Sequence, residues 1–264
     1  MDLRNARRVI ALAFLSLASA ASAANVAYDT AANTDYNSGW TNGSNGGFGF
    51  SAWAHSTTSG DGGQNGHFAG TGHSAFGRSW GMYANSGQTA STVRPFTGGS
   101  LSLNQTFSIS IDNGNIQNGG TVGLGLQTSG GTNRLEFFFV GGGSDYRYLR
   151  NGVAGSSEGT GVAFTGNGLR IFVTPLNSSD ARLRVTNATE SSELFNQVLT
   201  LASAADIARA RLFNANAGSG VAGSNDAFFD DVATPEPSSL ALFALASCSL
   251  LRRGSRASRT SRNR

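Results

Sequence analysis

The chain has 264 residues, with 19 basic and 16 acidic side chains, three histidines and one cysteine. All the basic residues are arginines, and nine of them lie near the two ends, so the middle keeps ten arginines against fourteen acidic residues. A middle region with a net charge of about −4 and no basic cluster argues against binding to nucleic acid, and a single cysteine excludes internal disulfides.

The first 23 residues have the pattern of a secretory signal peptide. Three arginines precede an apolar run over residues 9–18, and Ala21 and Ala23 flank one residue in the small-residue pattern that signal peptidase requires. The apolar run is shorter than the ~20 residues that span a bilayer. We therefore predict export, with signal peptidase as a partner and cleavage after Ala23.

Residues 37–77 are rich in glycine and form either long loops over one sheet face or strands broken by bulges. Trp40 stands among turn residues, and Trp53 follows in the same stretch. Exposed aromatic rings stack on sugar faces, whereas buried rings belong to the core. The sequence leaves both roles open, and we take Trp40 and Trp53 as candidate ligand-binding rings.

The same stretch holds the candidate metal ligands. Asp61 and Asn65 lie in a loop rich in Asp, Asn and Gly, the composition that supplies oxygen ligands to calcium. The turn preference of Asp and Asn explains these residues equally well. The histidines His55, His67 and His73 match no known metal-binding spacing. Calcium is the one cofactor that the sequence leaves possible.

Short runs of apolar residues that alternate with polar ones follow, separated by Gly, Asn and Ser. Residues 105–112 place Phe107, Ile109 and Ile111 on one face, as in a half-buried strand. Further strands are predicted over residues 47–54, 78–84, 92–97, 121–128, 133–140, 145–150, 169–174, 181–186, 194–201, 207–214 and 227–232. No helical period and no blade-length repeat occurs.

About a dozen strands in roughly 210 residues favour one all-β domain, an antiparallel two-sheet sandwich over residues 24–233. We predict a jelly roll that resembles the concanavalin A-like kind. Residues 79–87 and 211–220 are also similar to passages of uncharacterised exported bacterial sandwich proteins, a resemblance that concerns architecture alone.

A search for catalytic groups finds no convincing set. Jelly-roll laminarinases place two carboxylates in a Glu-x-Asp-x-x-Glu strand, which is missing here, and no G-x-S-x-G elbow occurs. Glu190 and Glu193 lie in a polar turn. Glu136 is better placed, but Arg134 projects from the same strand face, so we expect an ion pair between them. No catalytic residue is predicted.

The C-terminal region combines three features in order. Pro235, Glu236 and Pro237 precede an apolar run over residues 240–251, which is followed by an arginine cluster. This tail, residues 234–264, resembles the PEP-CTERM sorting signal of Gram-negative bacteria. The resemblance implies recognition by an exosortase-type membrane protease, a transient inner-membrane anchor and delivery to the cell surface or an exopolysaccharide matrix.

Together these patterns predict an exported surface or matrix protein without enzymatic activity, whose sandwich binds glycan. Two alternatives stay open. One is a structural or adhesive surface protein without a sugar site, and the other is a polysaccharide-degrading enzyme with an unfamiliar active site.

Overall fold

The computed structural model describes residues 25–60, 62–71, 75–219 and 224–235. Fifteen strands and one short 3-10 helix, η1 (Thr34–Tyr36), lie in these ranges. The strands are β1 (Asn25–Asp29), β2 (Ala54–Thr57), β3 (Asn65–Gly70), β4 (Ser79–Ala84), β5 (Thr89–Pro95), β6 (Phe107–Asn113), β7 (Thr121–Gln127), β8 (Asn133–Val140), β9 (Asp145–Arg150), β10 (Glu158–Ala163), β11 (Leu169–Pro175), β12 (Asp180–Asn187), β13 (Glu193–Thr200), β14 (Arg209–Ala215) and β15 (Ala227–Pro235).

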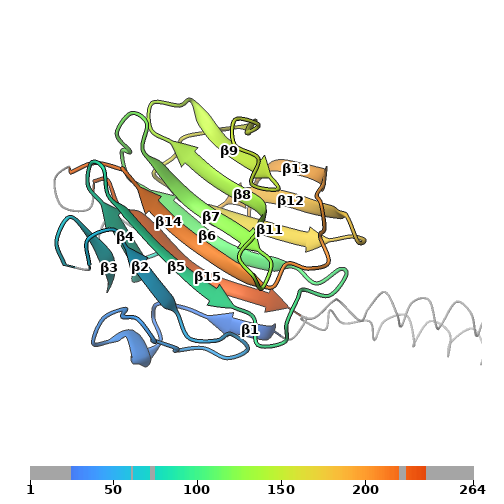
Figure 1. Ribbon diagram of the computed structural model, residues 1–264, viewed down its shortest axis with the longest axis horizontal. Helices are drawn as coiled ribbons and strands as arrows, with labels where there is room; N and C mark the ends of the chain where they lie inside the picture. Colours follow the sequence, from blue (N-terminus) through green and yellow to red (C-terminus); the bar gives the residue numbers. More distant parts are fainter. Residues whose placement is uncertain (1–24, 61, 72–74, 220–223, 236–264) are drawn as a thin grey trace, which may run out of the picture. The chain divides into compact units, whose positions relative to one another are not determined.

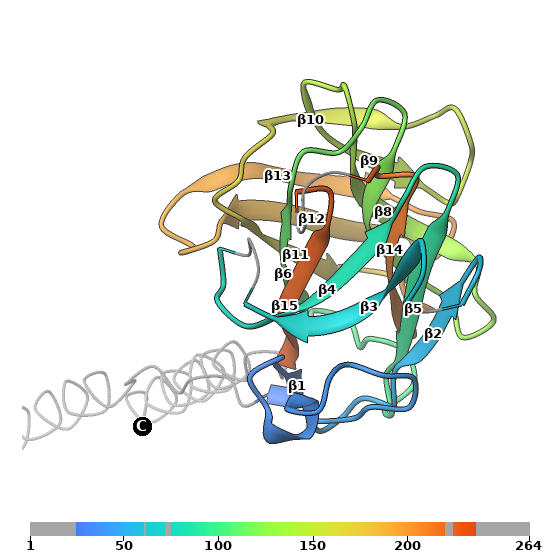
Figure 2. The same cartoon turned by 90° about the vertical axis from the view of Figure 1, so that its left-hand side faces the viewer.

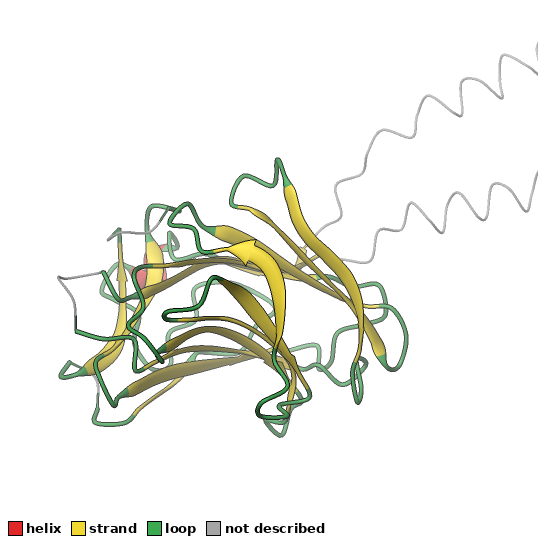
Figure 3. Cartoon of the chain, turned by 90° about the horizontal axis from the view of Figure 1, so that it is seen from above, coloured by secondary structure: helices red, strands yellow, loops and turns green. Residues whose placement is uncertain are grey.

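The strands form two antiparallel sheets that lie one behind the other (Figure 1) and appear as two layers in Figure 3. The eight-stranded sheet has the order β13-β12-β11-β6-β15-β4-β3, with β1 also paired to β15. The seven-stranded sheet has the order β10-β9-β8-β7-β14-β5-β2. The predicted all-β, two-sheet jelly-roll sandwich is confirmed.

The core lies between the sheets and is made by the alternating apolar residues of each strand. Phe107, Ile109 and Ile111 of β6 point into it and are fully buried, as predicted. The opposite face of β6 is also buried, including Ser110 and Asp112, so the expectation of a half-buried strand is wrong. On this face the backbone N–H of Ala75 donates a hydrogen bond to Asp112, and Arg170 donates one to the Ser108 hydroxyl.

Eleven of the twelve predicted strands are present, with the predicted ends for β8 and β9 and shifted ends for the others, but one is wrong. Residues 47–53 lie in no strand: Phe48 and Phe50 make only isolated bridges to Tyr28 and Phe96, and Ala54 begins β2. The strands that the pattern does not predict are β1, β2, β3 and β10. All four are short. Strands β2, β3 and β10 are also polar or glycine-rich, and they are edge strands, which need no second neighbour.

The long segment between β1 and β2 closes one end of the sandwich, where the edge strands β2 and β3 lie side by side (Figure 2). The rings of His55 on β2 and His67 on β3 stack with centroids 3.9 Å apart. The indole of Trp40 meets both rings edge-on, at 4.7 and 5.4 Å. The glycine-rich stretch is therefore part loop and part strand, and it packs into the fold.

The two ends of the described chain meet in the sheet. Strand β1 lies beside the end of β15 (Figure 1), and Asn25 is the register partner of Pro235. Strand β15 thus extends to Pro235, two residues past the predicted end of the domain. The residues between Asn25 and Pro235 fold as one unit.

Candidate functional site

The outer face of the seven-stranded sheet carries a hollow lined by residues of β7, β8, β9 and β14. Gly123 and Gly125 point outward from β7, between β8 on one side and β14 on the other. A Cβ atom at Gly123 would lie 2.3 Å from the Phe137 carbonyl oxygen and 2.6 Å from Phe138 Cβ. Strand β8 can therefore approach β7 this closely only because position 123 has no side chain.

Two charged side chains flank Gly125. Glu136 of β8 and Arg211 of β14 are the register partners of this glycine, and Arg211 Nη1 lies 3.7 Å from Glu136 Oε1. Burial raises the pKa of the Glu136 carboxyl and lowers the pKa of Arg211, and the opposite charge of each partner only partly offsets this. The two side chains are therefore close together and poorly solvated, but they make no hydrogen bond to each other.

The same two groups have unused hydrogen-bonding capacity. Among the residues that the structure describes, nothing donates a hydrogen bond to Glu136, and Arg211 donates none to protein oxygens. A carboxylate accepts up to four hydrogen bonds and a guanidinium donates five. Both groups are therefore ready to bond to a polar ligand in the hollow.

Aromatic rings flank the neighbouring glycine. Phe138 and Phe213 are the register partners of Gly123, and the Arg211 guanidinium lies 4.9 Å from the Phe213 ring centre. Leu149 of β9 lies beside Glu136. The hollow has a volume of about 250 Å³ and is lined by Thr121, Glu136, Phe138, Leu149, Arg211, Phe213 and Ala215.

The number of carboxyl groups in the hollow bears on whether it could cleave a glycosidic bond. Cleavage of a glycosidic bond by the usual route needs two carboxyl groups roughly 5 to 9 Å apart. Glu136 is the one carboxylate among the described residues that line the hollow. The arrangement offers an acceptor, a donor and an apolar wall, with no second acid.

The expected Glu136–Arg134 ion pair is wrong. Arg134 instead donates two hydrogen bonds to Asp206, at 2.9 and 2.6 Å, while Glu136 faces Arg211 across the bare glycine strand. Strand β7 lies between Glu136 and Arg211, so their backbones are about 9.6 Å apart, farther than the roughly 6.6 Å between Glu136 and Arg134 along one strand. Backbone spacing therefore does not favour this pair, and the side chains decide it, because Asp206 already engages Arg134. The glycine between the two charges lets them meet.

The proposal that Trp40 and Trp53 offer exposed rings to a sugar is also corrected. Both indoles are 1% exposed and pack together in the core with ring centres 5.1 Å apart, close to Trp80. Turn residues around Trp40 do indicate a loop, but that loop folds back over the open end of the sandwich. Neither ring has a face free for a ligand.

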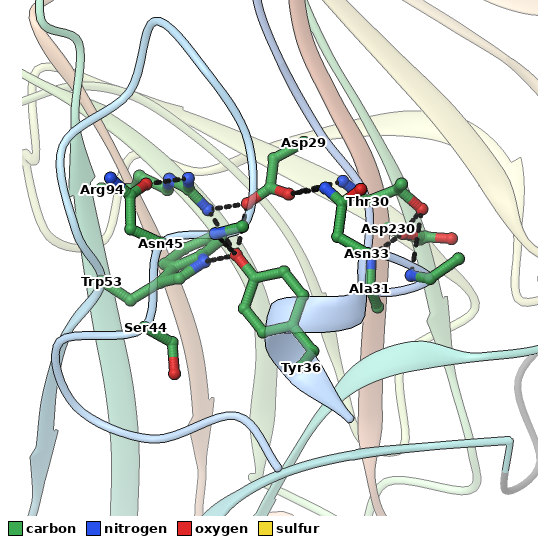
Figure 4. A network of polar contacts seen from close by, with 12 residues as sticks. Asp29, Thr30, Ala31, Asn33, Tyr36, Ser44, Asn45, Trp53, Arg94 and Asp230 are labelled. Atoms are coloured by element: carbon green, nitrogen blue, oxygen red, sulfur yellow. Dashed lines mark hydrogen bonds and ion pairs between the residues drawn. The ribbon is translucent and has the colours of Figure 1, made fainter. Parts of the chain in front are cut away.

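Figure 4 shows what holds this loop in place. Asp29 and Arg94 form a fully buried ion pair, and the Tyr36 hydroxyl donates to the same carboxylate. Trp53 Nε1 donates to the Tyr36 hydroxyl at 3.0 Å, and Arg94 also donates to Asn45 Oδ1 at 2.8 Å. Every member has a structural partner, so the network anchors the loop to β1 and β5.

Of the two candidate calcium ligands, Asp61 and Asn65, the structure describes only Asn65. Asp61 lies outside the described ranges. Asn65 is fully buried, its amide nitrogen donates to the Thr89 carbonyl at 3.2 Å, and its Oδ1 accepts from Ser59. Within the described ranges no three His, Cys, Asp or Glu side chains gather in a way that could hold a metal ion. The calcium expectation stays a prediction.

The remaining sequence candidates lie apart from the hollow. Glu190 pairs with Arg170, and Glu193 accepts hydrogen bonds from Asn196. Pro235 of the sorting motif ends β15, whereas Glu236, Pro237, Ala21 and Ala23 lie outside the described residues. No helix in the described part of the chain is long and apolar enough to cross a membrane.

Strand spacing in the sequence contains a signal for the hollow. Gly-x-Gly at 123–125, Glu-x-Phe at 136–138 and Arg-x-Phe at 211–213 each place two residues on one face of a strand. The order in which the three strands pair is what joins these fragments into one site, and the sequence pattern does not supply that order.

Comparisons with known proteins find similarity of structure only. No family model matches the chain, and no curated protein matches it. A carbohydrate esterase of the Shiga toxin-encoding bacteriophage phi24B is 14% identical over 81% of this chain and 98% of its own, with a TM-score of 0.48. The β-glucanase of Bacillus licheniformis is 12% identical over 72% of this chain and 93% of its own, with a TM-score of 0.43. A galectin of Caenorhabditis elegans is 10% identical over 55% of this chain and 89% of its own, with a TM-score of 0.38. At these identities and TM-scores, none of their activities is transferred to this chain.

Proposed function

We propose that this protein is an exported, non-enzymatic surface or matrix protein that binds glycan in the hollow on the outer face of the seven-stranded sheet. The observation that carries the proposal is the Glu136–Arg211 pair, whose hydrogen-bonding groups are unused beside two phenylalanine rings. Glycan is the ligand class that uses all of these groups together.

The chemistry of a sugar ring fits the hollow part by part. Its hydroxyl groups donate to a carboxylate and accept from a guanidinium, and such charge-assisted hydrogen bonds are about twice as strong as neutral ones. The C–H groups on one face of the sugar ring are apolar and pack against an aromatic ring. The hollow is smaller than the roughly 300 Å³ at which sites for drug-sized ligands begin. It suits one sugar unit of a chain that continues into solvent.

The test is a glycan array followed by calorimetry on the bound glycans, using residues 24–235. Glu136→Gln and Phe138→Ala are each expected to weaken binding about tenfold, which equals a loss of roughly 1.4 kcal/mol. Leu103→Ala is the control, because Leu103 is exposed in the loop before β6 and does not line the hollow. No binding on the array, or equal binding by all variants, would remove the proposal and favour a structural or adhesive role.

The enzymatic alternative has its own readout. A polysaccharide-degrading enzyme would release reducing sugar from the glycans that bind, and Glu136→Gln would abolish that release. We expect binding without release, because the hollow presents a single carboxylate. Release that depends on Glu136 would overturn the non-enzymatic part of the proposal.

Export and sorting form the second part of the proposal, and they rest on the two ends of the sequence. Signal peptidase would remove residues 1–23, and an exosortase-type protease would recognise Pro235, Glu236 and Pro237 at the inner membrane. The intact mass of the protein from its native host tests both steps. A mass lacking residues 1–23 and the arginines after residue 251 supports sorting, and a mass that keeps those arginines overturns it.

A further inference from the structure

The arginines of the domain divide into two groups. Of the ten between Asn25 and Pro235, eight make a hydrogen bond or ion pair with a protein oxygen. The other two, Arg182 and Arg184, have no such partner among the described residues. They are the second and fourth residues after Asp180 on β12, so both point away from the core on the outer face of the eight-stranded sheet.

These two cations lie on a patch with a mixed character. In one row across the sheet Arg184 lies between Phe172 of β11 and Asn196 of β13, and its guanidinium stacks on the Phe172 ring at 3.8 Å. In the next row Arg182 lies between Thr174 and Val198. Val198 is 53% exposed, so an apolar surface lies next to Arg182 on this face.

The nearest acidic groups on this face are already engaged. Asp180 accepts hydrogen bonds from Asn177 and Thr200, which lower the pKa of its carboxyl. Glu193 accepts from Asn196 at 3.1 and 3.2 Å. Neither carboxylate is within ion-pair distance of Arg182 or Arg184, so in an acidic domain two neighbouring positive charges stay without a counter-charge.

From this geometry we infer that the outer face of β11, β12 and β13 binds a carboxylated polysaccharide, a polymer that contains uronic acid units. Guanidinium groups bind carboxylates through paired hydrogen bonds, and stacking on Phe172 holds one guanidinium plane in a fixed orientation. The C–H faces of the sugar rings contact Val198 and Phe172. The two arginines are about 6.6 Å apart along the strand, so they contact successive parts of one chain.

Two other polyanions fit the patch less well. Nucleic acid binding draws on many phosphate contacts, and this face offers two free cations. An anionic membrane surface attracts clusters of four or more basic residues. A uronate polymer needs fewer charges, because each sugar unit also supplies apolar area and hydroxyl groups.

The experiment measures binding to polygalacturonate and to a neutral glucan at low ionic strength, by affinity gel electrophoresis of residues 24–235. The Arg182→Gln/Arg184→Gln variant is expected to bind polygalacturonate at least tenfold more weakly. The control Arg147→Gln/Arg150→Gln makes the same change in net charge on β9 of the other sheet and is expected to stay within twofold of the wild type. Thermal unfolding of each variant shows whether it is folded.

Further variants and a second binding assay distinguish this inference from its alternatives. Arg182→Lys/Arg184→Lys keeps the charge and loses the planar groups, so an intermediate affinity supports the inference. Unchanged binding by the double Gln variant overturns it, as does equal loss in the control pair. Binding of the protein to anionic vesicles but not to polygalacturonate also overturns it. Because the hollow lies on the other sheet, loss of binding there by Glu136→Gln does not bear on this result.

Discussion

At the scale of single residues, environment decides what a side chain does. Trp40 and Trp53 are chemically suited to bind sugars, yet the loop that carries them packs against the core and buries both rings. Glu136 has the same side chain as Glu193, but only Glu136 lies in a hollow beside aromatic rings. The residue type therefore limits which side chains could bind a ligand, and burial in the fold limits which of those a ligand can reach.

Replacement of Trp40 by alanine tests its role in the core. A fully buried tryptophan that becomes alanine leaves a cavity and costs about 3–5 kcal/mol of stability. Urea unfolding of Trp40→Ala is expected to show this loss, whereas Val198→Ala on the surface stays close to the wild type. A Trp40→Ala protein that keeps its stability but loses glycan binding would contradict the burial of this ring.

The buried carboxyl of Asp112 is expected to make the stability of the protein depend on pH. Its side chain is 2% exposed, its Oδ1 has no hydrogen-bond partner among the residues that the structure describes, and burial raises the pKa of the carboxyl above the ordinary 3.8. A raised pKa in the folded state means that ionisation costs stability as the pH rises through it. Asp112→Asn is therefore expected to be more stable than the wild type at pH 7, with the difference shrinking toward about pH 4.

Asp180 is the matched control for this measurement. Hydrogen bonds from Asn177 and Thr200 lower the pKa of its carboxyl, so its ionised form is favoured in the folded state. Asp180→Asn should lose stability at pH 7, and the loss should shrink as the pH falls. Urea unfolding midpoints at several pH values check both signs, and the same sign for both variants would contradict the assignment.

At the scale of strands, alternation in the sequence predicts the interior of the sheets well. The observed ends of β8 are the predicted ones, because β8 is an inner strand that pairs with β7 on one side and β9 on the other. The pattern misses β3 and β10, since an edge strand forms through its neighbour and needs few apolar residues of its own. The hollow escapes prediction for a related reason: β7, β8 and β14 meet through register, and β14 is far from the other two in the sequence.

The two outward glycines of β7 are expected to differ. A Cβ atom at Gly123 meets the Phe137 carbonyl oxygen at 2.3 Å, whereas one at Gly125 meets Glu136 Cγ at 3.4 Å. Gly123→Ala should therefore cost about 1–3 kcal/mol through overpacking. Gly125→Ala should fold with nearly unchanged stability and weaken glycan binding, because its methyl group lies under Glu136. Denaturant unfolding and calorimetry measure the two effects, and equal destabilisation would contradict them.

At the scale of the whole molecule, the two proposed binding surfaces lie on the outer faces of different sheets. The hollow offers one carboxylate and one guanidinium to a neutral sugar, and the patch on β11 to β13 offers two cations to an acidic one. A domain with both surfaces can hold two chemically different polysaccharides at once. The sequence predicted an extracellular sandwich that binds glycan, but the separation of the two surfaces follows only from the pairing of the strands.

The pairing of Asn25 with Pro235 makes the fold nearly continuous. Paired Cα atoms in antiparallel strands lie about 5 Å apart, so a short glycine linker can join these two residues without moving either. The exposed turn at Gly155, between β9 and β10, then provides a place for new ends. Such a circular permutant should form the same sheets and unfold near the melting temperature of the parent domain. The new ends lie in an exposed turn, and the linker leaves the pairing of β1 with β15 in place.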